Sequence, residues 1–184
     1  MNKNKNKKPL YLKKLILVLI VLFSFWGHAF ASTIDLENVE NSINQERSAR
    51  GLTKLKIDPN LNDAAAAKSK DMINRNYFEH YAFGLTPWDF IKQSGYNYLY
   101  AGENLAMDFN TSEGMMSAWM NSPLHRENVL NPDYTDMGVG IVKGEFTENG
   151  VTHSTTMVTN MFGRKKPFII KAFDYLTQNI LHLF

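Results

Sequence analysis

The sequence predicts one α+β domain in which helices come first and an antiparallel hairpin closes the domain at its C-terminal end. Apolar residues recur at helical spacing, with capping signals, between residues 36 and 122. From residue 137 onward, runs rich in β-branched residues and Met replace that spacing, and the Asn149-Gly150 dipeptide between them is a strong hairpin signal. An apolar content of 44% in 184 residues is enough for a packed core.

Residues 1–31 are predicted to be a signal peptide or a membrane anchor. The first 14 residues contain six lysines, and an apolar run follows over residues 15–26. Ala29-Phe30-Ala31 then matches the A-x-A pattern of a signal-peptide cleavage site. The run is short for a bilayer, since a helix of that length rises only about 18 Å against a hydrocarbon core of about 30 Å. Cleavage after Ala31 is therefore favoured over an uncleaved anchor that also uses residues 27–31, and either form would export the domain.

The charge and the cysteine content of the sequence argue against nucleic-acid binding and exclude cysteine-based chemistry. Six of the 20 basic residues precede residue 15. The chain without residues 1–31 therefore has 14 basic and 18 acidic residues, which gives it a net charge of −4 with histidine neutral. It contains no basic stripe with interleaved aromatic residues, so we expect no nucleic-acid partner. The absence of cysteine excludes disulfides, thiol nucleophiles and Cys-based zinc sites, and it fits an exported bacterial envelope protein.

Two helices are predicted before residue 76. The first carries an apolar stripe of Leu36, Val39 and Ile43 and ends near Arg50-Gly51, where glycine provides a C-terminal cap. The second begins at Asp58-Pro59, as N-cap and first helical residue. Leu61, Ala64, Ala65 and Met72 lie on or near one stripe of this helix, and its alanine run allows close packing.

Two further helices and two strands complete the predicted domain. The capping box Thr86-Pro87-Trp88-Asp89 starts a helix that stops at Gly95. Thr111 or Ser112 caps the next helix, which Pro123 interrupts. The predicted strands cover residues 137–143 and 151–162.

Residues 164–184 are predicted to form an amphipathic tail helix. After a basic stretch, the apolar residues follow one helical stripe: Ile169, Phe173, Leu176, Ile180 and Leu183. Such a helix can pack back on the domain, or its basic residues and apolar face can lie on a membrane surface. The sequence leaves both alternatives open.

Polar residues gather in stretches that we expect just beyond or between helices, and these stretches carry a family resemblance. They are Phe78-Glu79-His80, Gly102-Glu103-Asn104-Leu105-Ala106, and the run at residues 119–130 (WMNSPLHRENVL), followed by Met137-Gly138-Val139-Gly140. Their order and spacing resemble the CAP domain of the cysteine-rich secretory, antigen 5 and pathogenesis-related 1 superfamily, also called SCP-like, in its disulfide-free bacterial form. The resemblance covers about residues 43–162.

The resemblance implies a secreted three-layer α-β-α sandwich with a central cleft, here at residues 35–163. In many members two His and two Glu meet in that cleft and can hold a divalent metal. By motif, His80, Glu103 and His125 occupy three of these places, Ser122 stands at the fourth, and Asn104 lies beside Glu103. Two imidazoles and one carboxylate with an open position would suit a catalytic zinc ion, although the missing second carboxylate weakens any cation site.

Each of these residues also has a purely structural interpretation. Glu103 and Asn104 can tie a buried loop through backbone hydrogen bonds, because buried polar groups need partners. His80 and His125 can hydrogen-bond across the cleft without a metal. Phe78 and Trp119 are expected in the core, and His153 is expected to be an ordinary polar strand residue.

The sequence is compatible with three functions. The first is a cell-surface or extracellular binding module for a lipid, a peptide or a wall component, supported by the Tyr and Met residues between positions 96 and 116. The second is a metal-assisted hydrolase of protease type, in which Glu79 or Glu127 assists a zinc-bound water. The third is a structural envelope protein with a vestigial cleft. No H-E-x-x-H, G-x-S-x-G, P-loop or G-x-G-x-x-G motif occurs, so no catalytic residue is assigned.

Overall fold

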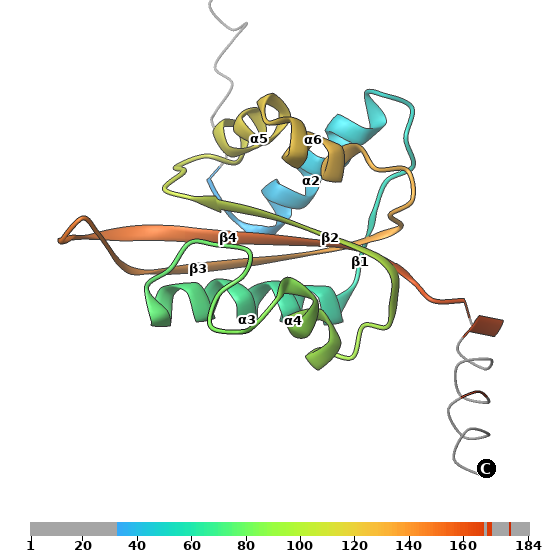
Figure 1. Ribbon diagram of the computed structural model, residues 1–184. Coiled ribbons are helices and arrows are strands. Elements are labelled where there is room, and N and C mark those ends of the chain that lie inside the picture. The colour runs from blue at the N-terminus through green and yellow to red at the C-terminus, as the bar shows by residue number, and fades with distance from the viewer. Residues whose placement is uncertain (1–32, 168, 171–176, 178–184) are drawn as a thin grey trace, which may run out of the picture. The chain divides into compact units, whose positions relative to one another are not determined.

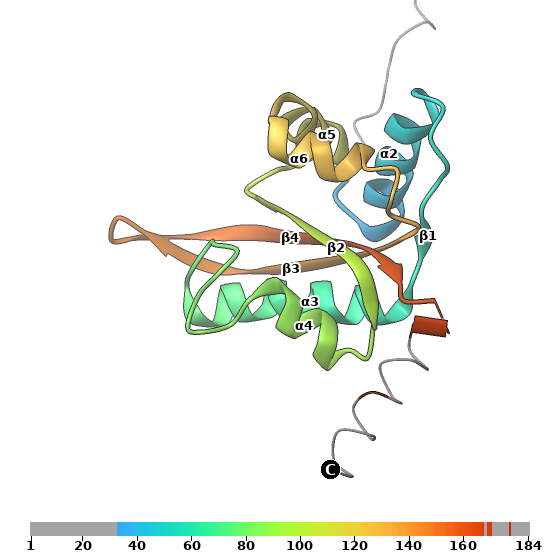
Figure 2. The same ribbon diagram turned by 45° about the vertical axis from the view of Figure 1, so that its right-hand side comes forward.

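The computed structural model describes residues 33–167, 169–170 and 177, and it confirms the α+β class and the three-layer α-β-α arrangement. A four-stranded sheet lies between two helical layers, with α3 and α4 on one face and α2, α5 and α6 on the other (Figures 1 and 2). The helices are α2 (Leu36–Ser48), α3 (Pro59–Arg75), α4 (Pro87–Gln93), α5 (Ser112–Asn121) and α6 (Pro123–Leu130). The strands are β1 (Lys56–Ile57), β2 (Tyr98–Met107), β3 (Asp136–Glu148) and β4 (Val151–Lys165).

The predicted leader lies outside the described residues, as does most of the predicted tail helix. Within the tail, residues 169, 170 and 177 are helical, and Ile169 is exposed. No helix in the described part of the chain has the length and apolar character needed to cross a bilayer.

The sheet order is β1-β3-β4-β2, with β1 parallel to β3 and the other pairs antiparallel. The predicted hairpin is confirmed, because Asn149 (φ 51°) and Gly150 (φ 79°) both adopt the positive φ of a type I′ turn between β3 and β4. Both strands are longer than predicted. Residues 144–148 pair across the hairpin, but their one large apolar residue, the buried Phe146, stands among Glu145, Thr147 and Glu148, so the apolar signal there is weak.

The edge strand β2 lies between α4 and α5, where the sequence analysis placed its polar stretch between helices, but a strand was not predicted there. Glu103 and Asn104 stand side by side in the middle of the strand and both are buried. Two adjacent polar residues interrupt the alternation of apolar and polar residues that marks a half-buried strand. Helix α6 was also not predicted, although Ser122-Pro123 provides an N-cap and a first helical residue.

Close packing of α3 on β3 explains the two glycines of the Met137-Gly138-Val139-Gly140 stretch. A Cβ atom at Gly138 would meet the α3 backbone at Leu61, and one at Gly140 would meet it at Ala65. The Ser69 hydroxyl adds a hydrogen bond to the Gly140 carbonyl at 3.0 Å. The predicted role of the alanine run in close packing is therefore confirmed.

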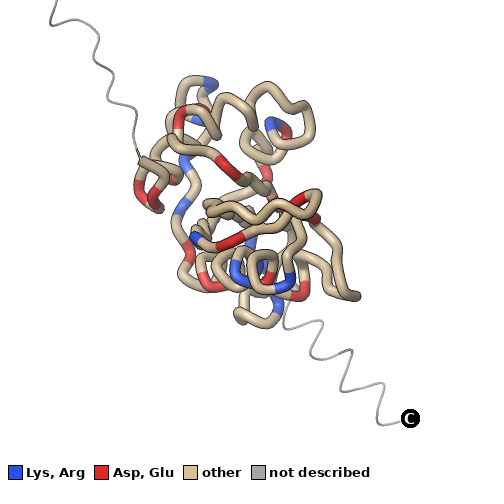
Figure 3. The backbone as a smooth tube through the Cα atoms, turned by 90° about the vertical axis from the view of Figure 1, so that its left-hand side faces the viewer, with Lys and Arg blue, Asp and Glu red and all other residues tan. Residues whose placement is uncertain are grey.

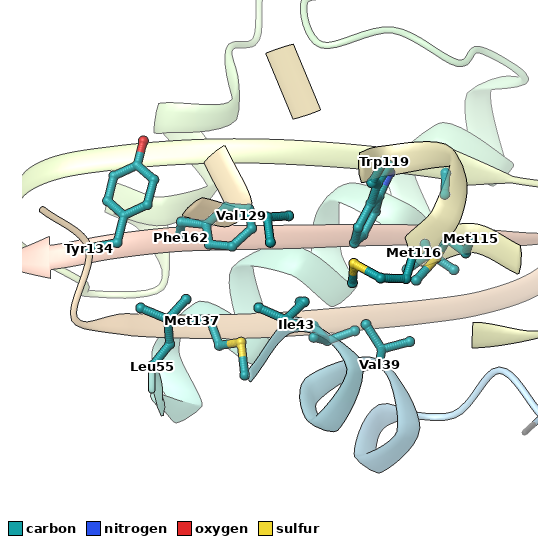
Figure 4. Close-up of a cluster of buried hydrophobic side chains, with 13 residues drawn as sticks. Val39, Ile43, Leu55, Met115, Met116, Trp119, Val129, Tyr134, Met137 and Phe162 are labelled. Carbon is teal, nitrogen blue, oxygen red and sulfur yellow. The ribbon is translucent and has the colours of Figure 1, made fainter. Parts of the chain in front are cut away.

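The opposite face of the sheet holds the largest apolar cluster, in which side chains of α2 and α5 meet those of β3 and β4 (Figure 4). Leu36 is not part of this core, since 45% of its surface is exposed at the first residue of α2. The helix instead buries Arg47, whose guanidinium donates to the carbonyls of Val129 at 2.9 Å and Asn131 at 2.8 Å. Arg47 thus fixes the end of α6 to α2.

The helix caps follow the predicted residues. Asp58 caps α3 by accepting from the Asn60 N–H at 3.0 Å, and Thr111, rather than Ser112, caps α5 by accepting from the Gly114 N–H at 3.1 Å. At α4 the Asp89 carboxylate accepts from the Thr86 N–H at 2.8 Å. These caps satisfy the first backbone donors of each helix.

Candidate functional site

A cleft of about 420 Å³ opens along the outer edge of β2. One wall comes from α4 and the segment before it, the floor from β2, and the other wall from α6 with its N-cap. The lining residues in that order are His80, Tyr81, Pro87, Trp88, Ala101, Gly102, Glu103, Ser122, Leu124, His125 and Asn128. The two helical layers therefore contribute opposite walls.

His80 and Glu103 form the central polar pair of the cleft. The His80 Nδ1 lies 2.6 Å from the Glu103 Oε1, and only 2% of the Glu103 side chain is exposed. An ionised carboxylate only accepts hydrogen bonds, so the proton of this bond then lies on Nδ1. The second oxygen of Glu103, Oε2, is buried and has no hydrogen-bond partner. Glu103 thereby fixes the orientation and the tautomer of His80.

Burial is the main influence on the pKa of the Glu103 carboxyl. It raises the pKa of the Glu103 carboxyl above its ordinary value, while the hydrogen bond from His80 and the charge of Lys68 act in the opposite direction. Because burial is the largest of these causes, the net shift is upward. The carboxyl therefore holds its proton to higher pH than an exposed glutamate.

His125 faces the cleft from the first turn of α6. Burial lowers the pKa of its imidazole, and the charge of nearby His80 lowers it further. The His125 ring lies 6.4 Å from the Trp119 ring, between centroids, and its backbone carbonyl accepts from the Asn104 side chain at 3.0 Å. Asn104 therefore lies behind the cleft and holds the start of α6 in place.

Side chains cover the outward carbonyls of β2. Tyr134 donates to Ala101 at 3.1 Å, Asn128 to Glu103 at 3.0 Å, and the Trp119 indole to Leu105 at 2.9 Å. These carbonyls alternate along the strand, as expected for groups that face away from β4. These three carbonyls on the edge of β2 therefore already have hydrogen-bond donors, two of which, Trp119 and Asn128, belong to the 119–130 stretch.

Gly102 allows this covering network to approach the strand. A Cβ atom at this position would lie 2.7 Å from the Asn128 Oδ1 and closer still to the Tyr134 hydroxyl, where no atom fits. Asn128 also donates to the Asn104 Oδ1 at 2.9 Å. The Gly102-Glu103-Asn104 sequence thus combines close approach, a cleft acid and a support for α6.

Most of the predicted cleft residues lie around this one cleft. His80, Glu103, His125 and Ser122 line it, and Asn104 lies beneath it. The ring of His80 bonds to Glu103 and not to His125. Further lining residues were not predicted, although several belong to motifs that the sequence analysis singled out: Tyr81, Pro87, Trp88, Leu124 and Asn128.

Two core expectations had different outcomes. Trp119 is 2% exposed, as predicted, whereas Phe78 is 38% exposed, so its placement in the core is wrong. Phe78 lies in the segment after α3, which has no regular structure to turn the ring inward. His153 lies in β4 with its Nε2 3.3 Å from the Asp108 carboxylate, at a partly exposed position.

The three predicted zinc ligands do not form a ready-made metal site in this structure. In residues 33–167 no group of three His, Asp or Glu side chains is arranged to hold a metal ion. The Glu103 Oε1 is bonded to His80, and its Oε2 is enclosed. Neither Glu79 nor Glu127 lines the cleft. Zinc binding by His80, Glu103 and His125 stays a prediction, and no chemical step is assigned to it.

The fold and the cleft define an SCP-like domain, and comparison with known proteins gives the family. The profile of the cysteine-rich secretory protein family, CAP, matches residues 40–160. The chain belongs to this family.

Relatives in other bacteria share this domain. Bacillus subtilis YkwD is 47% identical over 102 residues, which cover 54% of this chain and 39% of that protein. A crystal structure of an extracellular SCP-domain protein from Bacillus anthracis superposes with a TM-score of 0.60 at 30% identity, covering 71% of this chain and 40% of that one. This chain therefore spans about two fifths of the length of both relatives.

An outer surface protein of Borrelia burgdorferi has the same fold over its whole length. Its TM-score is 0.60 at 24% identity, and the match covers 74% of this chain and 100% of that chain. At this identity the likeness concerns the fold alone.

Proposed function

We propose that this chain is an exported binding module whose cleft takes an uncharged polar ligand with apolar faces, such as a saccharide of the cell wall. The observation that carries the proposal is the lining of the cleft. Tyr81, Trp88 and Leu124 offer apolar surface, while the hydroxyl of Ser122 offers a neutral donor and acceptor and the Oδ1 of Asn128 a neutral acceptor. Export is supported by the predicted leader and by the extracellular relative from Bacillus anthracis.

The charges of the cleft favour an uncharged ligand. Glu103 is the one carboxylate among the lining residues, and its exposed fraction is small. His80 already bonds to it, and the lowered pKa of His125 keeps that ring neutral near pH 7. A charged ligand would find no free counter-charge in this lining, whereas hydroxyl and amide groups would find donors and acceptors.

The same lining is less suited to a lipid or an extended peptide. A lipid chain would cover the His80–Glu103 pair without offering it hydrogen bonds, which is unfavourable for polar groups. An extended peptide commonly binds by adding a strand to a sheet edge. Here the carbonyls of Ala101 and Glu103 on that edge are already bonded to Tyr134 and Asn128.

Calorimetric titration of the full chain tests this proposal. The probes are a chitin trisaccharide, a short neutral peptide and a single-chain phospholipid. We expect the saccharide to bind and Trp88→Ala to weaken its affinity about tenfold or more, because stacking of a large ring is lost. Lys92→Ala, on the exposed side of the same helix α4, is the matched control and should leave affinity unchanged. Binding of the lipid or peptide alone would contradict the proposed ligand class.

A metal-assisted hydrolase is the second candidate, favoured by the carboxylate that orients an imidazole, an arrangement common in general-base sites. Incubation of the chain with peptide substrates, with and without added zinc, tests it. Turnover that disappears in His80→Ala would support the hydrolase. A chain that neither binds the probes nor turns over any substrate would leave the third candidate, a structural envelope protein with a vestigial cleft.

A further inference from the structure

We propose that Lys68 is a positioning residue of the cleft: its buried ammonium holds the backbone at His80 and so keeps the His80 ring on Glu103. Lys68 is a buried residue of α3 and is not among the cleft-lining residues. Its effect on ligand binding rests on the proposed function, whereas its effect on His80 does not.

The ammonium of Lys68 is bonded to the segment that carries His80. Lys68 is 0% exposed, and its Nζ donates to the backbone carbonyl of Glu79 at 2.8 Å and to that of His80 at 3.1 Å. A third contact, to the Tyr77 hydroxyl, measures 3.3 Å. One cation therefore bonds to three groups within four consecutive residues of the chain.

The surroundings of Lys68 keep this ammonium away from water. Its Nζ lies 4.8 Å from the centroid of the Tyr77 ring and 5.5 Å from that of the Phe90 ring. The carboxylates of Glu103, Asp71 and Glu79 act on its charge from further away. The directional contacts of the cation are thus the two carbonyls and the phenol, which fix its position and theirs.

Side chains anchor the segment on either side of His80, since the Tyr77 hydroxyl donates to Asp71 at 2.6 Å and the Phe83 ring lies 5.0 Å from the Arg75 guanidinium, but neither contact is made by the carbonyls of Glu79 and His80. The segment between α3 and α4 contains a single isolated bridge, from Ala82 to Leu85, and a turn in which Phe83 (φ 53°) and Gly84 (φ 75°) adopt positive φ. No helix or strand fixes the carbonyls of Glu79 and His80. Without Lys68 these carbonyls would turn toward water, and the His80 ring would move from its 2.6 Å contact with Glu103.

The test is the tautomer of His80 in Lys68→Met, read from long-range proton–nitrogen NMR correlations of the full chain. In the wild-type chain the ring proton of His80 should lie on Nδ1, because Glu103 accepts it. Methionine fills the buried space without a charge, so the fold should persist. We expect the His80 proton to shift largely to Nε2 in this variant, and the proposed ligand to bind at least threefold more weakly.

Lys70→Met is the matched control, since it removes the same charge from an exposed position of the same helix. It should leave the His80 tautomer unchanged, as should Lys68→Arg, which keeps a cation and its donors. If Lys68→Met does not fold, Lys68→Gln takes its place, because one amide can bond only part of the segment.

An Nδ1 proton that persists on His80 when Lys68 is replaced by Met or Gln would overturn this inference. The measurement needs no ligand, so its failure is distinct from failure of the binding proposal. A chain that binds none of the probes but loses the Nδ1 proton in Lys68→Met would contradict the proposed function and support the role of Lys68.

Discussion

Glu103 and Asn104 are neighbours on β2, and they act on opposite faces of the sheet. Side chains alternate along a strand, so Glu103 points toward the α3 side, where it meets His80, while Asn104 points toward α6 and bonds to the His125 carbonyl. The sequence identified both residues through their motif. Their separate partners could not be predicted, because that required knowing that the pair lies on a strand.

His125 makes the stability of the domain depend on pH. Its pKa in the folded chain is lowered, so as pH falls through about 6.5 the unfolded chain takes up a proton before the folded chain does. The stabilising contribution of the neutral ring is therefore present above that pH and is lost below it. Urea unfolding at about pH 7.5 and pH 5.5 should show a smaller loss of stability for His125→Gln than for the wild-type chain.

His153→Gln is the matched control for this experiment, because His153 lies on the hairpin, away from the cleft lining. The same pH-dependent loss in His125→Gln and in the wild-type chain would contradict the assignment to His125.

At the scale of elements, local signals predicted the parts of the fold that local chemistry determines. The caps at Asp58 and Thr86 and the turn at Asn149-Gly150 lie where the sequence indicated, since each depends on residues within one turn. The strand β2 was missed for the opposite reason. Its buried Glu103 and Asn104 are stable there only because side chains from α6 and from the segment after α3 bond to them.

The contact between α3 and β3 should tolerate no added methyl group at Gly140. In Gly140→Ala the new Cβ would overlap the α3 backbone at Ala65, which cannot move without shifting the helix. We expect a loss of about 2–4 kcal/mol in the free energy of unfolding, measured by urea denaturation.

Gly144→Ala is the matched control on the same strand, because its new Cβ would meet only the side chain of Ile73 and no backbone atom of α3. It should lose less than half as much stability. Equal losses in the two variants would show that backbone contact with α3 is not what requires glycine at position 140.

At the scale of the whole molecule, charges of both signs are spread over the domain with no extended region of one sign (Figure 3). The family resemblance implied that His80, Glu103 and His125 share one cleft, and in the structure all three line the same cleft. The apolar lining of the cleft could not be predicted from the sequence. Tyr81 and Trp88 come from the α4 side and Leu124 from α6, so the lining depends on how two helical layers flank the edge of β2.

The most direct test of the central claim is a crystal structure of the chain grown with the chitin trisaccharide. We predict that the sugar lies in the cleft between Trp88 and Asn128, with hydrogen bonds to His80 or Ser122. A sugar bound instead in the second groove, of about 310 Å³ between α2 and α5, would contradict the assignment of the site. A cleft that holds no sugar at concentrations well above the calorimetric dissociation constant would contradict the proposed function itself.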